Sequence, residues 1–178
     1  MKKIVVVSST PRKGGNSEIL AQQFAEGAKA AGHEVAFVSV RDLGLKFCIG
    51  CMSCQKTGKC VLDDGMNGLY ETFRNADALA FASPVYYYSV SGQLKTFFDR
   101  LNPLYPKENN FRDVYLLATA AENEASAVDG AATAVQGWID CFDGARLKSV
   151  LRGIGLEGKG EASGTVFARQ AYEMGKSV

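Results

Sequence analysis

Residues 2–17 read KKIVVVSSTPRKGGNS, and the order of residue types in this stretch decides the fold. Residues 2–7 are rich in β-branched side chains, which is typical of a strand buried on both faces. A turn rich in glycine and small polar residues follows. Apolar residues then recur at helical spacing from Ile19 to Ala28, and Gly32 suits the end of a helix. A buried strand joined by a short turn to an amphipathic helix is the first unit of a parallel α/β sheet.

The same alternation of strand and helix continues along the chain. Further strands are predicted at residues 34–40, 78–82, 114–119 and 146–151, and helices at residues 66–75, 93–100, 125–142 and 166–175. Ser83 and Pro84 are expected to end the third strand. Alternating strands and helices predict a doubly wound parallel sheet with right-handed crossovers and helices on both faces. We therefore expect one α/β domain over residues 1–178.

Composition and charge give no support for a nucleic-acid-binding or membrane protein. The chain has 178 residues, of which 47% are apolar and 22% charged, with a net charge of +1. Lys and Arg are scattered, which gives no reason to expect nucleic acid as a partner. No apolar run approaches the roughly 18–20 residues that cross a bilayer, so no membrane is expected. The apolar run at residues 4–7 is too short for a signal peptide, and we expect a cytoplasmic protein.

The first loop, residues 8–17, is predicted to bind an anion. In doubly wound sheets, ligands bind beyond the carboxyl ends of the strands, where the strand order reverses. A helix N-terminus attracts phosphate, and Gly14 and Gly15 allow positive φ and a close backbone approach. Arg12 can add a charge-assisted contact. The spacing is not that of a P-loop. A turn capped by Asn16 or Ser17 without any ligand is the alternative.

A second glycine motif occurs near the end of the chain. Residues 153–158 read GIGLEG and match the dinucleotide pattern G-x-G-x-x-G. Only twenty residues follow them, too few for a strand–helix–strand unit with an acidic ribose partner. We interpret this segment as a loop.

The loops after the third and fourth strands read SPVYYYSVSG and TAAENEAS. Three adjacent tyrosines could form a wall for a flat aromatic cofactor, whose polar edge would be read by backbone groups. The alternative is that the tyrosines cover the core or an oligomer interface. In the following helix, Lys95 and Asp99 are four residues apart and are expected to pair, and Arg100 is expected at the surface or in helix pairing.

Four of the five cysteines lie close together. Cys48, Cys51, Cys54 and Cys60 have the spacing C-x2-C-x2-C-x5-C, which resembles the cysteine run of bacterial ferredoxins. Four thiolates could also hold zinc, and a loop with no metal is a third possibility. Disulfides are rare in the cytosol. The fifth, Cys141, lies in a predicted helix and is expected to be a core residue.

Together these motifs resemble a known family. STPRKGGNS is similar to the phosphate loop of NAD(P)H-dependent FMN reductases, and SPVYYYSVSGQLKTFFDR to their second FMN loop and helix. Between them, CIGCMSCQKTGKCVLDDGM resembles the iron–sulfur flavoprotein branch. The resemblance covers roughly residues 3–119. It implies a flavodoxin-like three-layer sandwich with a five-stranded parallel sheet in the order 2-1-3-4-5.

The resemblance also implies a set of FMN-binding residues. They would come from the first loop, from the second loop along the isoalloxazine ring, and from the strand-four loop on its other side. In that order they are Ser9, Thr10, Arg12, Gly15, Asn16 and Ser17; Pro84, Val85, Tyr86, Tyr87, Tyr88 and Ser89; and Thr119, Ala120, Ala121 and Glu122. Ser9 replaces the usual glycine of the family. Cys48, Cys51, Cys54 and Cys60 would hold a [4Fe-4S] cluster.

The expected function is that of an FMN-dependent oxidoreductase. Electrons would come from NAD(P)H or a ferredoxin-type donor, and no side chain is assigned a catalytic proton transfer. The family suggests a homodimer or homotetramer in which the cysteine loop lies near a neighbouring subunit's flavin. An electron carrier without NAD(P)H activity is the alternative, although carriers often have a stronger net charge. A non-redox module that binds a phosphate ligand is a third possibility.

Overall fold

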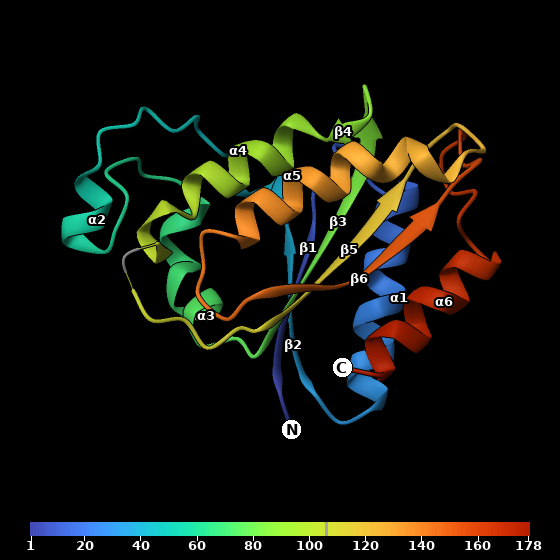
Figure 1. The fold of residues 1–178 in the computed structure, drawn as a ribbon, viewed down its shortest axis with the longest axis horizontal. Coiled ribbons are helices and arrows are strands. Elements are labelled where there is room, and N and C mark those ends of the chain that lie inside the picture. The colour runs from blue at the N-terminus through green and yellow to red at the C-terminus, as the bar shows by residue number, and fades with distance from the viewer. Residues whose placement is uncertain (106) are drawn as a thin grey trace.

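The computed structural model describes residues 1–105 and 107–178. Its parallel sheet has the strand order β2-β1-β3-β5-β6 (Figure 1). These strands span Glu34–Ser39, Lys3–Ser8, Ala78–Tyr86, Asp113–Thr119 and Arg146–Gly153 in that order. The predicted five-stranded order is confirmed. A sixth strand, β4 at Ser89–Val90, pairs antiparallel with the end of β3 and was not predicted.

Helices cover both faces of the sheet and complete three layers (Figure 1). On one face, α1 (Asn16–Ala30) and α6 (Val166–Lys176) pack on side chains such as Ile4 and Val6. Two glycines bring these helices close together, because a Cβ on Gly27 would lie 1.9 Å from the Tyr172 carbonyl oxygen and one on Gly175 would lie 2.0 Å from that of Phe24. Backbones this close leave no room for a side chain at either glycine.

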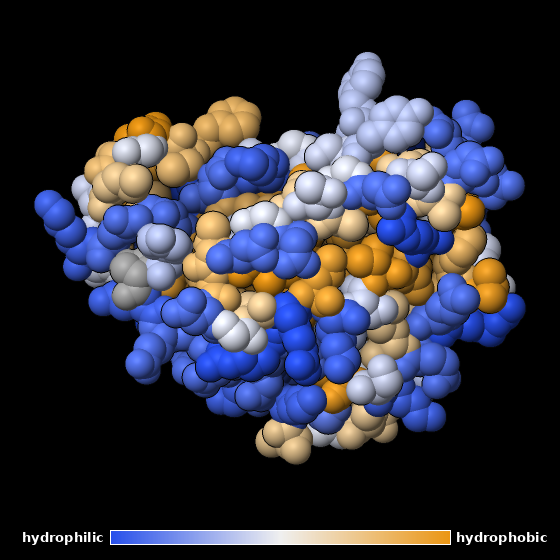
Figure 2. Space-filling view, viewed as in Figure 1, coloured by the Kyte–Doolittle hydropathy of each residue, from blue (hydrophilic) through white to orange (hydrophobic). Residues whose placement is uncertain are grey.

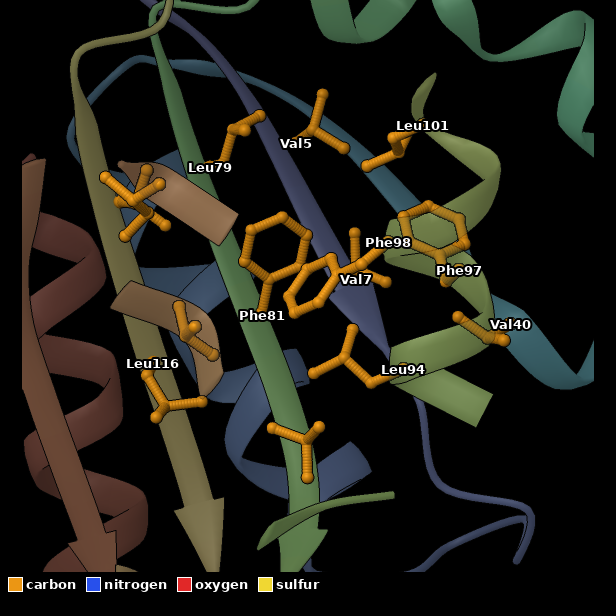
Figure 3. Close-up of a cluster of buried hydrophobic side chains, with 14 of the residues drawn as sticks. Val5, Val7, Val40, Leu79, Phe81, Leu94, Phe97, Phe98, Leu101 and Leu116 are labelled. Carbon is orange, nitrogen blue, oxygen red and sulfur yellow. The ribbon is translucent and has the colours of Figure 1, made fainter. Parts of the chain in front are cut away.

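The other face carries the larger core, which packs against α3 (Tyr70–Arg74), α4 (Gly92–Arg100) and α5 (Asp129–Ile139). Val7, Phe81 and Leu116 point from three neighbouring strands toward Leu94 and Phe98 of α4 (Figure 3). Alternate residues of one strand therefore enter different cores, as the continuous apolar runs in the sequence predicted.

The boundaries predicted for the third strand and for the helix at 125–142 were wrong. Strand β3 does not end at Ser83 and Pro84, because Pro84 pairs in register with Thr119 of β5. The carbonyl of Ala82 accepts a hydrogen bond from the Ser9 N–H, so the backbone of Ala82 and of Pro84, two residues on, faces β1. Since β1 has already ended there, no N–H is needed from Pro84. The predicted helix at 125–142 is shorter, with a 3-10 turn at Ala125–Val128 before α5.

The segment between β2 and α3 holds little regular structure. It contains 3-10 turns at Val40–Leu43 and Gly65–Gly68 and the five-residue α2 (Ser53–Thr57). A further 3-10 turn, Asn102–Leu104, follows α4. In the part of the chain that the structure describes, no helix is both long enough and apolar enough to cross a bilayer.

Candidate functional site

The turn between β1 and α1 is shaped by two glycines with different roles. Gly14 has a φ of 70°, in the left-handed region that favours glycine. Gly15 is extended, with a φ of −73°. A Cβ on Gly15 would lie 2.9 Å from Thr10 Oγ1, so this glycine is required by the close approach of the turn to itself. The predicted positive φ therefore applies to Gly14 and not to Gly15.

A cavity of about 170 Å³ lies where the three predicted loops meet. Nine of the predicted cofactor residues line it: Thr10, Arg12, Asn16, Ser17, Pro84, Val85, Tyr86, Thr119 and Ala121. Leu156 and Glu157 also line it, and neither was predicted. The carboxyl ends of β1, β3 and β5 are adjacent in the sheet, which is why loops so far apart in the sequence converge here.

Ser17 is a buried polar residue of this cavity whose hydroxyl has no hydrogen-bond partner among the described residues. It is 1% exposed, and its Oγ makes no hydrogen bond with any described residue. Because buried hydroxyls are normally paired, an unpaired one that lines a cavity points to a ligand. The hydroxyl lies in the first turn of α1, where backbone N–H groups also lack intrahelical partners. These donors suit a phosphate group.

A second cavity, of about 210 Å³, shares Val85 and Ala121 with the first. Its other lining residues are Tyr87, Tyr88, Ala120, Glu122 and Ala127. Apart from Ala127, all are in the predicted cofactor set. Its walls combine aromatic side chains with backbone from two loops, which suits a flat ring with a polar edge.

Three predicted cofactor residues line neither cavity. Gly15 shapes the turn, and Ser89 belongs to β4 opposite Tyr86. Ser9 is buried, and its Oγ donates to the Ala82 carbonyl at 2.9 Å and lies 3.0 Å from Ser91 Oγ. Cys60 and the other cysteines lie elsewhere. The serine that replaces the family's glycine therefore ties the end of β1 to β3 and α4.

The tip of the β3–β4 hairpin is held in an unusual conformation. Tyr87 and Tyr88 have φ values of 48° and 59°, and a two-residue hairpin turn of type I′ requires positive φ at both central positions. Non-glycine residues rarely adopt these angles. Helix α5 supports the tip, because Gly130 packs so closely that a Cβ there would lie 2.1 Å from the Tyr88 carbonyl oxygen. Strain that neighbouring elements maintain is frequent at functional sites.

One hydrogen bond joins the second and third loops across the second cavity. The Tyr88 hydroxyl donates to Glu122 Oε1 at 2.6 Å. This hydrogen bond, helped by the negative charge of Glu122, raises the pKa of Tyr88 above its ordinary value. Tyr87 is fully exposed at the tip. Tyr88 is therefore the tyrosine held against the third loop, whereas Tyr86 lines the first cavity and the Tyr87 side chain is exposed at the tip.

Residues 46–62, which contain four of the cysteines and are called the cysteine segment here, are fastened to α4 beside a buried ion pair between Arg100 and Asp64. Arg100 is 1% exposed, contrary to its predicted place at the surface, and donates to both carboxylate oxygens of Asp64. It also donates to the carbonyls of Lys46 at 2.7 Å and Leu62 at 3.4 Å. Lys46 and Leu62 flank the four cysteines, so one guanidinium holds both ends of the segment. The predicted pair of Lys95 with Asp99 forms at 2.7 Å.

The same contacts set the ionisation of neighbouring groups. Burial alone would raise the pKa of Asp64, but the hydrogen bonds from Arg100 and from the backbone of Lys46 and Met66 outweigh burial and lower it. Burial raises the pKa of Tyr70 to about 12. Asp64 is therefore ionised and Tyr70 neutral at pH 7.

All five cysteines line one cavity of about 430 Å³. Cys141 is exposed there, so its predicted place in the core was wrong. Over residues 1–105 and 107–178, no three Cys, His, Asp or Glu side chains are arranged to hold a metal ion. The thiols therefore share a cavity without forming a ligand set. Apolar side chains gather over this segment at the upper left of Figure 2, and Phe47, Ile49, Met52 and Val61 are each more than half exposed.

Two further contacts at the first loop were not foreseen. Glu18 is 6% exposed, accepts a hydrogen bond from the Gly14 N–H, and pairs with Arg41 Nη2 at 3.1 Å. The side-chain amide of Asn16 forms hydrogen bonds with the backbone of Leu156, Gly158 and Ala162. An acidic residue in the first turn of a predicted helix was the available signal for Glu18. No sequence signal indicated the partners of Asn16, which lie about 140 residues away in the chain and were found from the structure.

Comparison with known proteins places the chain in a family. The family model described as NADPH-dependent FMN reductase matches residues 2–154. The iron–sulfur flavoprotein MJ1083 of Methanocaldococcus jannaschii is 36% identical over 102 residues, which is 57% of this chain and 53% of that protein. The iron–sulfur flavoprotein of Methanosarcina thermophila is 39% identical over 98 residues, 55% of this chain and 51% of that protein. The chain thus spans about half the length of these curated relatives.

Solved structures agree on the fold. The NAD(P)H:quinone oxidoreductase from Methanothermobacter marburgensis superposes with a TM-score of 0.76 at 18% identity, covering 99% of this chain and 95% of that one. At this identity the likeness concerns the fold alone. Together with the family match over residues 2–154, the findings confirm the predicted family: the chain belongs to the NADPH-dependent FMN reductase family.

Proposed function

We propose that this protein is a single-domain, cytoplasmic, FMN-dependent oxidoreductase. The observation that carries the proposal is the convergence of three loops on two adjoining cavities, with the unpartnered Ser17 hydroxyl in the first. Membership of a family described as FMN reductases supports it independently. A phosphate module without a ring site would not need the aromatic second cavity.

The residues divide into two groups by the part of FMN that they suit. Thr10, Arg12 and Ser17, with the N-terminus of α1, suit the phosphate. Val85, Tyr86, Tyr88 and the 120–122 backbone suit the isoalloxazine ring and its polar edge.

When bound, FMN accepts hydride or single electrons, and the protein supplies binding, orientation and electrostatics. The hairpin tip and α5 keep the ring walls in place, because Gly130 fits against the Tyr88 backbone. The Tyr88–Glu122 hydrogen bond holds the second loop to the third. Thus the side chains around the ring position it, and none of them is assigned a proton transfer.

We further propose a nicotinamide or similar electron donor, with NAD(P)H or a ferredoxin-type protein as the candidates. Homo-oligomers are proposed because the exposed apolar residues of the cysteine segment would gain from burial. The shared cavity of Cys48, Cys51, Cys54 and Cys60, with relatives named iron–sulfur flavoproteins, supports a [4Fe-4S] cluster as a second candidate group. The thiols would have to move together to hold it.

Anaerobic mixing of the FMN-loaded protein with NADH or NADPH tests the activity. Rapid loss of the visible flavin absorbance supports the oxidoreductase. A protein that holds FMN but is reduced by neither nucleotide would exclude NAD(P)H as the donor and would leave the ferredoxin-type donor and the electron-carrier alternative. The phosphate site has its own test: Arg12→Ala should weaken FMN binding by about tenfold, the effect of one charge-assisted hydrogen bond. Unchanged affinity would contradict the role of Arg12.

A further inference from the structure

We propose that residues 154–162, the loop after β6, form a fourth wall of the FMN site, that Asn16 positions this loop, and that Lys159 on it contacts the cofactor phosphate. The proposal rests on the FMN site proposed above. It concerns residues mostly beyond the family match, which ends at residue 154.

The loop is built onto the third loop through its backbone. The Ala120 N–H donates to the Gly153 carbonyl, and the Leu156 N–H returns a hydrogen bond to the Ala120 carbonyl, both at 2.9 Å. The Gly155 N–H donates to the Glu122 carbonyl at 2.9 Å. Three backbone bonds thus fix the start of the loop to the residues that line the second cavity.

Asn16 fastens the rest of the loop to the first turn of α1. Its Nδ2 donates to the carbonyls of Leu156 at 3.2 Å and Gly158 at 2.8 Å, and its Oδ1 accepts from the Ala162 N–H at 3.0 Å. Both amide hydrogens and the oxygen are therefore engaged within the protein. The Asn16 side chain was predicted to bind the phosphate directly, but these contacts make it a positioning residue.

The loop brings a cation to the phosphate end of the cavity. The Glu161 carboxylate accepts from the Gly158 N–H at 2.8 Å and closes the turn before Lys159. Lys159 Cε would lie 3.5 Å from a Cβ placed on Gly14, so the lysine stem lies over the turn that begins α1. Leu156 and Glu157 of the same loop line the cavity that holds the unpartnered Ser17 hydroxyl.

The other charges at this end of the cavity leave a role for Lys159. Glu18 is already paired with Arg41 and the Gly14 N–H, whereas Glu157 is one of the residues that line the cavity. A phosphate beside Glu157 needs cations to offset that charge. Arg12, which lines the cavity, supplies one, and Lys159, which lies beside Gly14, supplies the second.

Titration of the apoprotein with FMN and with riboflavin, which lacks the phosphate, tests the proposal. Lys159 is exposed, so Lys159→Ala should fold normally and bind FMN about two- to fivefold more weakly, as expected for an exposed charge pair. Riboflavin affinity should not change. Lys29→Ala, at the other end of α1, removes the same charge and should leave both affinities unchanged.

Asn16→Ala should lower the ratio of FMN to riboflavin affinity by the same factor, and adding Lys159→Ala should lower it no further. An unchanged ratio in Lys159→Ala would overturn the proposal while leaving the FMN site intact. An equal loss of both flavins in Asn16→Ala would overturn its positioning role. A wild-type protein that binds neither flavin would overturn the proposed function itself.

Discussion

Replacing Arg100 by methionine is expected to destabilise the protein strongly and to loosen the cysteine segment. Arg100 is 1% exposed and makes hydrogen bonds to both Asp64 oxygens and to two backbone carbonyls. Methionine fills a similar volume but leaves the buried Asp64 carboxylate without an opposite charge. Removing one partner of a buried ion pair costs about 3–5 kcal/mol. In a domain of this size, that corresponds to a fall in Tm of about 6–20 °C.

Urea unfolding followed by circular dichroism measures the effect, and limited proteolysis shows where the chain opens. Arg146→Met is the matched control, because Arg146 pairs with Asp113 but its side chain is 65% exposed. Such a pair contributes about 0–1 kcal/mol. Cleavage of Arg100→Met should begin within residues 46–62. If both variants unfolded at the same urea concentration, the reasoning about the buried ion pair of Arg100 with Asp64 would be refuted.

Three further predictions concern other contacts. Gly130→Ala should lower the free energy of unfolding in urea by about 1–3 kcal/mol, because the new Cβ would meet the Tyr88 carbonyl oxygen. On the same helix, a Cβ on Gly137 meets nothing within 4 Å, so Gly137→Ala should not destabilise the protein, and equal effects of the two variants would count against the close contact. Glu122→Gln should lower the pKa of Tyr88 toward its ordinary value of about 10, as read from tyrosinate absorbance, and an unchanged titration would exclude their hydrogen bond. Since the pKa of Asp64 is lowered in the folded protein, the ionised carboxylate stabilises the fold at neutral pH, and this stabilisation is lost as the pH falls below about 4. The difference in unfolding free energy between wild type and Arg100→Met should therefore narrow at low pH, and a difference that stayed constant down to about pH 2 would contradict this.

The parallel α/β fold and the convergence of the loops could be predicted because they follow from local patterns, whereas the strand order was implied by the resemblance to FMN reductases. Buried strands and amphipathic helices alternate visibly in the sequence, and parallel topology then brings the carboxyl ends of β1, β3 and β5 together. The extension of β3 through Pro84 could not be predicted, because it depends on where the neighbouring strand β1 ends.

The roles of single polar side chains were harder to predict. A buried arginine at the end of an amphipathic helix looks the same in sequence as an exposed one, and Arg100 differs only through Asp64 and the carbonyls that surround it. Asn16 and Ser17 are neighbours with similar capping preferences, yet one is fully hydrogen-bonded and the other has no described partner. Such differences depend on segments far apart in the sequence, which local propensity does not encode.

The most direct test of the central claim is the flavin content of the protein after anaerobic purification, with iron and sulfide measured on the same sample. The account predicts stoichiometric FMN and a flavin absorption spectrum, whether or not iron is present. Stoichiometric iron and sulfide would add the cluster, and their absence would remove only that candidate. A colourless protein whose apo form fails to quench the fluorescence of added FMN would contradict the assignment of the cavities lined by Ser17 and Tyr88.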